Sequence, residues 1–128
     1  MEVKIAKNAG FCFGVKRAMK MAWDELEKSN DGIYALGPLI HNKQAVDRYK
    51  EKGLMEMDSL EKIPNDSKLI IRSHGVAKKI YTESKSKNMD IVDTTCPFVK
   101  KIHDIVKEFS NNGYKIIIVG NAAHPEII

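Results

Sequence analysis

Two cysteines stand where a strand is expected to turn into a helix. Cys12 lies in the glycine-rich stretch 10–14, and Cys96 lies between the apolar pair 91–92 and Pro97. Proline is well tolerated at the first helical position, so Cys96 is expected at a helix N-terminus. Backbone N–H groups and the helix dipole favour a thiolate there, and a thiolate binds metal or attacks an electrophile. Both cysteines are therefore candidates for chemistry.

Three histidines each stand in the loop that follows an apolar run, at His41, His74 and His124, and Glu126 shares the last of these loops. Open parallel sheets bind ligands just outside the carboxyl ends of their strands, where helix N-termini also attract anions. A single loop histidine is more often a surface or capping residue. Three in equivalent places favour a function, whereas His103, inside a predicted helix, is expected to be structural.

These residue types leave several kinds of site open. Zinc sites normally show close ligand pairs such as Cys-x2-Cys, and this chain has only two, widely separated cysteines. A nucleophilic Cys–His pair remains possible on spacing alone. An iron–sulfur cluster usually takes four cysteine thiolates, so that interpretation requires cysteine from outside these 128 residues.

Strands and helices alternate along the whole chain, which indicates an α/β fold with a mostly parallel sheet. The helix from Gly14 is predicted by apolar residues at helical spacing up to Leu26. The helix that starts at Pro97 is expected to bury its apolar stripe: Val99, Ile102, Val106 and Phe109. Strands are predicted at residues 2–6, 33–36, 54–57, 68–71, 91–92 and 115–119, with further helices near 43–52 and 76–87.

The bulk composition is that of a soluble globular protein, with 43% hydrophobic and 30% charged residues. No apolar run approaches the ~20 residues that a membrane span needs, and the first residues do not form a signal peptide. We therefore expect a cytoplasmic protein without a membrane or nucleic-acid partner. The net charge of +4 suits an anionic small molecule, although solvated lysines explain it equally well.

Five motifs together resemble one enzyme family, the 4-hydroxy-3-methylbut-2-enyl diphosphate reductases, in order and spacing. They are Gly10-Phe11-Cys12-Phe13-Gly14-Val15, Gly37-Pro38-Leu39-Ile40-His41-Asn42, Ser73-His74-Gly75-Val76, Asp93-Thr94-Thr95-Cys96-Pro97 and Gly120-Asn121-Ala122-Ala123-His124-Pro125-Glu126. Each motif is weak alone, but the five extend over nearly all of the chain, which makes the resemblance specific.

The resemblance implies the last step of the methylerythritol phosphate route to isoprenoids. The family removes the allylic hydroxyl of its substrate reductively and forms isopentenyl and dimethylallyl diphosphates. Its oxygen-sensitive 4Fe–4S cluster is held by three cysteines, which leaves one iron open, and a ferredoxin- or flavodoxin-type protein supplies the electrons.

Residue by residue, the resemblance implies that Cys12 and Cys96 are two of the three cluster ligands. It implies that His41, His74 and His124 contact the diphosphate, and that His124 can also take part in proton supply. Glu126 is implied as the acid that delivers a proton during C–O cleavage. A carboxylate beside a diphosphate can be tuned to hold a proton near neutral pH.

The family is about twice as long as this chain and consists of three α/β modules around the cluster. The resemblance implies an N-terminal strand and cysteine loop at residues 1–13, a first module at 14–96 and the start of a second at 97–128. The apolar pair Ile127-Ile128 follows an exit loop, which also suggests a longer protein. Without the third cysteine, these residues are expected to be inactive and iron-free, and to self-associate through the apolar run 116–119.

Two other functions remain open on the residues alone. A cysteine-dependent hydrolase or transferase would use Cys96 with one of the histidines. A non-catalytic anion-binding module would rest on the mild positive charge and the helix N-termini. An iron–sulfur chromophore in the full-length protein separates the reductase from both.

Overall fold

The computed structural model describes residues 1–29, 32–121, 124 and 127. Its regular elements alternate as the sequence predicts, in the order α1 (Phe13–Lys28), β1 (Ile33–Leu36), α2 (Lys43–Glu51), β2 (Leu54–Met57), the 3-10 helix η1 (Leu60–Lys62), β3 (Lys68–Ile71), α3 (Lys78–Ser86), β4 (Asp90–Asp93) and α4 (Pro97–Asn111). The four strands form one sheet in the order β2-β1-β3-β4. All three neighbouring pairs are parallel, which confirms the α/β fold class.

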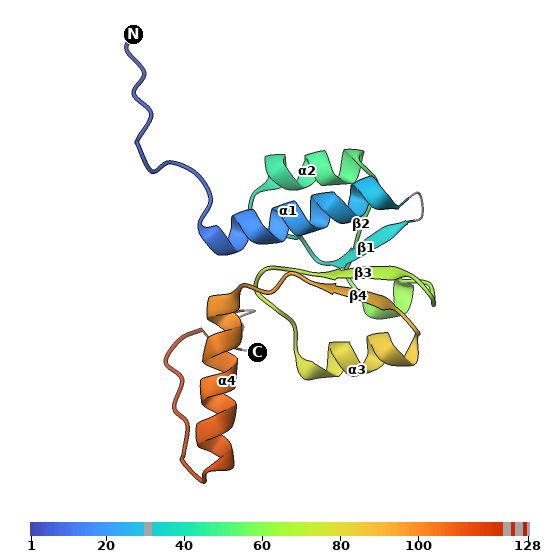
Figure 1. Cartoon of the computed structure of the whole chain (residues 1–128), viewed down its shortest axis with the longest axis vertical. Helices are drawn as coiled ribbons and strands as arrows, with labels where there is room; N and C mark the ends of the chain where they lie inside the picture. Colours follow the sequence, from blue (N-terminus) through green and yellow to red (C-terminus); the bar gives the residue numbers. More distant parts are fainter. Residues whose placement is uncertain (30–31, 122–123, 125–126, 128) are drawn as a thin grey trace.

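Helices cover both faces of this sheet, α1 and α2 on one side and α3 on the other (Figure 1). Alternate residues of each strand therefore enter different cores. Ile33 and Ala35 of β1 pack in the core beneath α1 and α2, whereas Tyr34 packs against the core beneath α3. Burial on both faces explains why β3 reads as a nearly continuous apolar run.

The carboxyl ends of the parallel strands lie at one edge of the sheet, and the helices α1 and α4 both begin on this side (Figure 1). Cys12 is the N-cap residue of α1, and Cys96 is the N-cap residue of α4. Pro97 occupies the first turn of α4, as its fixed backbone angle favours. The fold thus places the predicted cysteine positions at helix N-termini.

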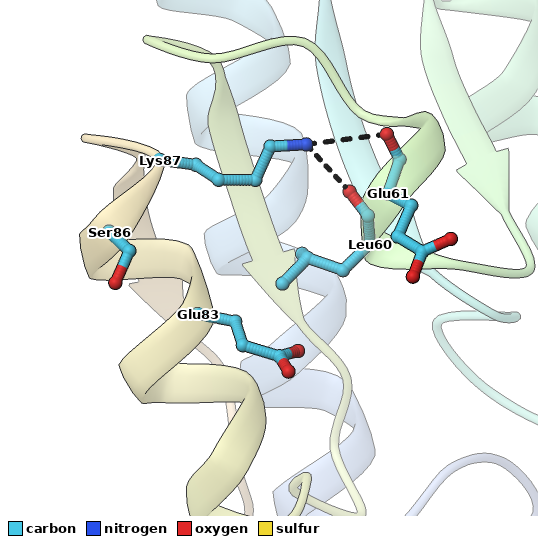
Figure 2. Close-up of a pocket in the computed structure, with 5 residues that line it drawn as sticks. All are labelled: Leu60, Glu61, Glu83, Ser86 and Lys87. Atoms are coloured by element: carbon cyan, nitrogen blue, oxygen red, sulfur yellow. Dashed lines mark hydrogen bonds between the residues drawn. The ribbon is translucent and has the colours of Figure 1, made fainter.

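Figure 2 shows a cavity of about 380 Å³ at the opposite edge of the sheet, between α3 and η1. The ammonium of Lys87 donates hydrogen bonds to the carbonyl oxygens of Leu60 at 3.1 Å and Glu61 at 3.3 Å. It also donates to the carbonyl of Ile63 at 2.5 Å. Lys87 therefore ties η1 to the end of α3, and none of the predicted site residues that the structure describes lines this cavity.

Two predicted strands are wrong. Residues 2–6 have no regular structure, and neither do residues 114–119. A strand is stable only when a neighbouring strand pairs with its backbone, and the four-stranded sheet pairs with neither segment. Val3 is consequently 74% exposed and Ile117 is 87% exposed.

The prediction that α4 buries its apolar stripe is also wrong for this structure. The helix projects away from the sheet (Figure 1), and none of its described residues is buried. Ile102 is 59% exposed and Phe109 is 43% exposed. Three members of the stripe line an open groove of about 580 Å³: Val99, Ile102 and Val106. Val76, just before α3, and Val119, after α4, line the same groove. Helix α4 is thus amphipathic, as predicted, but no described element packs closely enough to bury its apolar stripe.

Candidate functional site

The two cysteine-bearing helix ends lie in contact. A Cβ atom on Gly14 would stand only 2.4 Å from the Sγ atom of Cys96, so the thiol of α4 lies against the first turn of α1. The rings of Phe13 and Phe98, in the same two turns, meet edge to face with centroids 6.4 Å apart. The structure therefore brings Cys12 and Cys96, 84 positions apart in the sequence, to neighbouring helix N-termini.

Neither cysteine side chain caps its own helix, and both thiols are free of disulfide bonds. Cys12 is exposed, whereas Cys96 is partly buried. A free cysteine thiol in this position can serve as a metal ligand. Within the part of the chain that the structure describes, no three His, Cys, Asp or Glu side chains converge as a metal-binding group.

The three predicted histidines also come together, although they come from separate loops. The ring centroids of His41 and His74 are 4.6 Å apart, and those of His74 and His124 are 6.4 Å apart. The strand order explains this, because β1 and β3 are adjacent and their exit loops carry His41 and His74. Three imidazoles at one sheet edge can present several N–H donors to a single anion.

The histidine group is joined to the cysteine pair through the backbone. The amide of Cys96 donates to the carbonyl oxygen of Ser73 at 2.9 Å, so the loop that carries His74 holds the start of α4. Arg17 of α1 donates to the carbonyl oxygen of Thr95 at 3.4 Å. One edge of the sheet therefore carries both sets of candidate residues. Glu126, the predicted acid, lies outside the described residues.

His103, predicted to be structural, lies on α4 and is exposed. Its ring approaches the space beside Gly75, where a Cβ atom would stand 3.8 Å from its Cε1 atom. Gly75 has a positive φ of 81° and directly follows His74, so the turn there favours glycine. His103 thus lies beside the loop that carries His74 and is not one of the three histidines whose rings come together.

Sequence reasoning missed Arg72, which directly precedes Ser73 and His74. Its Nη1 atom lies 3.2 Å from the place that a Cβ would take on Gly37, in the loop that leads to His41. Its Nε atom is buried and has no hydrogen-bond partner among the described residues. Arginine is always charged, so this side chain adds a fixed positive charge at the histidine edge. Only the fold, by pairing β1 with β3, reveals this proximity.

Asp93, at the end of β4, was also missed, although the pattern Asp-Thr-Thr is typical of a side-chain-closed turn. Burial acts to raise the pKa of this carboxyl group. The ammonium of Lys100 and the hydroxyl and amide of Thr95 act more strongly in the other direction, and the pKa is lowered overall. Burial raises the pKa of the neighbouring Tyr81 phenol, which donates to Asp93 at 3.2 Å.

Comparison with known proteins gives one consistent result. A family model described as "LytB protein" matches residues 3–128. A protein of Clostridioides difficile named 4-hydroxy-3-methylbut-2-enyl diphosphate reductase is 66% identical over 128 residues. A protein of the same name from Caldanaerobacter subterraneus is 51% identical. The matches cover all of this chain but only 46% of each relative, so the chain spans about half of their length.

Solved structures of similar proteins agree in fold. A structure of (E)-4-hydroxy-3-methyl-but-2-enyl diphosphate reductase, described as the terminal enzyme of the non-mevalonate pathway, superposes with a TM-score of 0.85 at 41% identity. The match covers 98% of this chain and 44% of the chain in that structure. A structure of the E-1-hydroxy-2-methyl-but-2-enyl-4-diphosphate reductase from Plasmodium falciparum superposes with a TM-score of 0.91 at 30% identity. The match covers 94% of this chain and 38% of the other.

Proposed function

The chain belongs to the LytB protein family, and from that premise we propose that it is the amino-terminal part of an oxidoreductase of isoprenoid biosynthesis. The proposed substrate is 4-hydroxy-3-methylbut-2-enyl diphosphate, and the products are isopentenyl and dimethylallyl diphosphates. The observation that most supports this function is the group of three histidine rings beside a helix that begins at a cysteine.

The cysteines suit an iron–sulfur cofactor by their chemistry and their placement. Cys12 and Cys96 offer two thiols at adjacent helix N-termini. Gly14 leaves room for the Cys96 sulfur beside α1. We assign both residues as ligands of a 4Fe–4S cluster whose third cysteine comes from outside residues 1–128. When bound, the cluster supplies electrons and a Lewis-acidic iron.

The histidines are proposed to hold the diphosphate. His41 is exposed and can reach an incoming anion, while His74 lies between His41 and His124. Ring N–H groups donate charge-assisted hydrogen bonds to phosphate oxygens. Arg72, behind the same loop, stabilises the negative charge at longer range. The diphosphate would thereby fix the position of the allylic end of the substrate.

Proton supply is assigned to Glu126, with His124 in the same loop as its partner. Replacing the allylic C–O bond by C–H consumes two electrons and two protons and releases water. One proton must reach the departing oxygen and the other must reach carbon, so the site needs an acid beside the substrate. A carboxyl group near an anion holds its proton at higher pH than usual. A ferredoxin- or flavodoxin-type protein is the proposed electron donor.

The proposed location is the cytoplasm. Among the described residues, no helix is long and apolar enough to cross a membrane. Electron carriers of the proposed type and a charged diphosphate substrate are both water-soluble. The proposal therefore includes neither a membrane nor a nucleic-acid partner for these residues.

The function is tested with the full-length protein, purified without oxygen and supplied with a chemical reductant. We expect the substrate to be converted to the two C5 diphosphates, and Glu126→Gln to lower turnover by ~10²–10⁴-fold while diphosphate binding persists. Glu108→Gln, on the exposed face of α4, is the matched control and should retain full turnover. A colourless protein that is active in air would instead indicate a Cys96-dependent hydrolase.

A further inference from the structure

The carboxylate of Asp93 binds residues on both sides of Cys96. The Oδ1 atom of Asp93 accepts from the backbone N–H of Thr95 at 2.9 Å and from its hydroxyl at 2.5 Å. The Oδ2 atom accepts from the Tyr81 phenol at 3.2 Å and from the Lys100 ammonium at 2.6 Å. Asp93 thus has four donors from three residues, which lie on α3, before Cys96 and after it.

These contacts fix the turn that leads into α4. The bonds to Thr95 close a turn immediately before Cys96, as aspartate side chains commonly do. Lys100 lies one helical turn after Cys96, and its backbone N–H donates to the Cys96 carbonyl oxygen at 3.0 Å. Because Asp93 holds both Thr95 and Lys100, the backbone of Cys96 has little freedom to rotate.

The carboxylate is well placed for this role because it is only partly exposed. Its side chain is 25% exposed, compared with 47% for Lys100. Thr94 and Thr95 are buried, and the Thr94 hydroxyl donates to the Ile71 carbonyl of the neighbouring strand. Hydrogen bonds in such a partly desolvated site are stronger than at an open surface.

We propose that Asp93 is a positioning residue for the Cys96 thiol, which it holds against Gly14 at the start of α1. The carboxylate does not touch the sulfur. It fixes the direction of the Cys96 Cα–Cβ bond through Thr95 and Lys100, so that the thiol points toward the cysteine-bearing turn of the other helix. The role in cluster binding rests on the proposed function, whereas the direction of the thiol does not.

The direct readout is the rate at which iodoacetamide alkylates each cysteine in the full-length protein without its cluster, resolved by peptide mass spectrometry. Cys12 is exposed and serves as the internal reference for reagent and pH. Asp93→Ala should raise the ratio of Cys96 to Cys12 alkylation about tenfold, because each lost bond to a charged group frees the turn. Asp58→Ala removes an exposed ion pair, with Lys62, and should leave the ratio unchanged.

Lys100→Met separates positioning from simple electrostatics. If the charge of Lys100 alone mattered, its removal should slow alkylation of Cys96. If the ion pair between Asp93 and Lys100 positions the thiol, its loss should instead make alkylation of Cys96 faster. Asp93→Asn keeps an acceptor for the Thr95 N–H. Its ratio of Cys96 to Cys12 alkylation should lie between the ratios of the wild type and Asp93→Ala. This variant remains informative if Asp93→Ala does not fold.

The outcomes discriminate cleanly when the melting temperature of each variant is unchanged. A raised alkylation ratio in Asp93→Asn and Lys100→Met supports the proposal. An unchanged ratio in both, or a lower ratio in Lys100→Met, overturns it. Iron content after anaerobic reconstitution is measured in parallel. Absence of iron from the wild-type protein would contradict the reductase function but leave the alkylation result to decide the role of Asp93.

Discussion

Gly14 has no side chain, and the Cys96 sulfur occupies the space where one would be. The residue lies inside α1, where alanine is normally favoured over glycine by up to ~1 kcal/mol. Its backbone is not in the left-handed region, so conformational freedom does not explain the glycine. The close approach of the thiol does, and it makes Gly14 part of the cysteine site.

Gly14→Ala should therefore displace the Cys96 thiol and change the stability of the fold only slightly. A methyl group 2.4 Å from Sγ forces Cys96 to rotate, while the added helix propensity offsets part of the cost. We expect faster alkylation of Cys96 and loss of iron from the full-length protein, at nearly unchanged melting temperature. In a Cys96→Ala background the same substitution should be neutral or stabilising. Equal effects on stability in both backgrounds would contradict the steric explanation.

Residue types and spacing selected the cysteines and histidines as candidates. For His41, His74 and Cys96 the reason holds, because each follows a strand that ends at the same edge of the parallel sheet. Cys12 and His124 follow segments that are irregular in the structure, so the expected strands do not account for their placement. The sequence could not show that the Cys96 sulfur meets Gly14 or that Arg72 lies against Gly37. Those contacts depend on the strand order β2-β1-β3-β4, which no local pattern specifies. The functional roles of the site residues stay predictions.

At the scale of elements, an ion pair fastens α1 to the edge of the sheet where β3 begins. Lys68 donates to Glu25 at 2.5 Å and lies 3.3 Å from Asp90. Hydrogen bonds from Lys68, and then from Lys28, lower the pKa of Glu25. The hydrogen bond with Glu25 in turn raises the pKa of Lys68. This connection holds the helix that carries Cys12 against the sheet.

Glu25→Gln should lower the free energy of unfolding at pH 7 by about 1 kcal/mol, because both side chains are partly exposed. A carboxyl group with a lowered folded-state pKa stabilises the fold above its ordinary pKa and loses that contribution as pH falls through the folded value. The difference from wild type should therefore shrink as the pH falls below the ordinary value of 4.5 and disappear below the lowered folded-state pKa of Glu25. Urea titrations at several pH values measure it.

Asp24→Asn is the matched control, since Asp24 pairs with the exposed Lys20 on the same helix. It should change the free energy of unfolding little at any pH. A pH-independent loss in Glu25→Gln would show that packing, and not the ion pair, is responsible.

Regular elements were predicted well wherever the pattern was amphipathic and a neighbour was available. Helix α1 and the four paired strands follow this rule. Residues 2–6 and 115–119 have strand-like patterns but no paired strand, and they remain irregular. Strand propensity describes how a segment fits a sheet, so it cannot replace the missing backbone partners.

At the scale of the whole molecule, the apolar surface is uneven. Exposed aromatic and aliphatic side chains gather on α4 and on the segment that follows it: Phe98, Ile102, Ile105, Phe109, Ile117 and Val119. Exposed apolar surface of this extent marks an interaction site or an aggregation hazard. The sheet and its three covering helices, by contrast, have packed cores on both faces.

The 128-residue chain should therefore self-associate, and light scattering coupled to size exclusion should show a mass that rises with concentration. Ile102→Glu and Ile117→Lys, which place charges on this surface, should each shift the chain toward the monomer. Val3→Lys is the control, because Val3 is similarly exposed but lies in the extended N-terminal segment far from α4 (Figure 1). A monomer at all concentrations would show that this surface is covered within the chain.

The central claim, that Cys12 and Cys96 are ligands of an iron–sulfur cluster, is tested most directly by iron and sulfide content. The measurement compares full-length Cys12→Ser, Cys96→Ser and His103→Asn proteins, all purified without oxygen. We predict that each cysteine variant loses the cluster or holds it only weakly, while the His103 variant retains iron and sulfide at the level of the wild type. Full iron and sulfide in either cysteine variant would remove that residue from the ligand set and contradict the account.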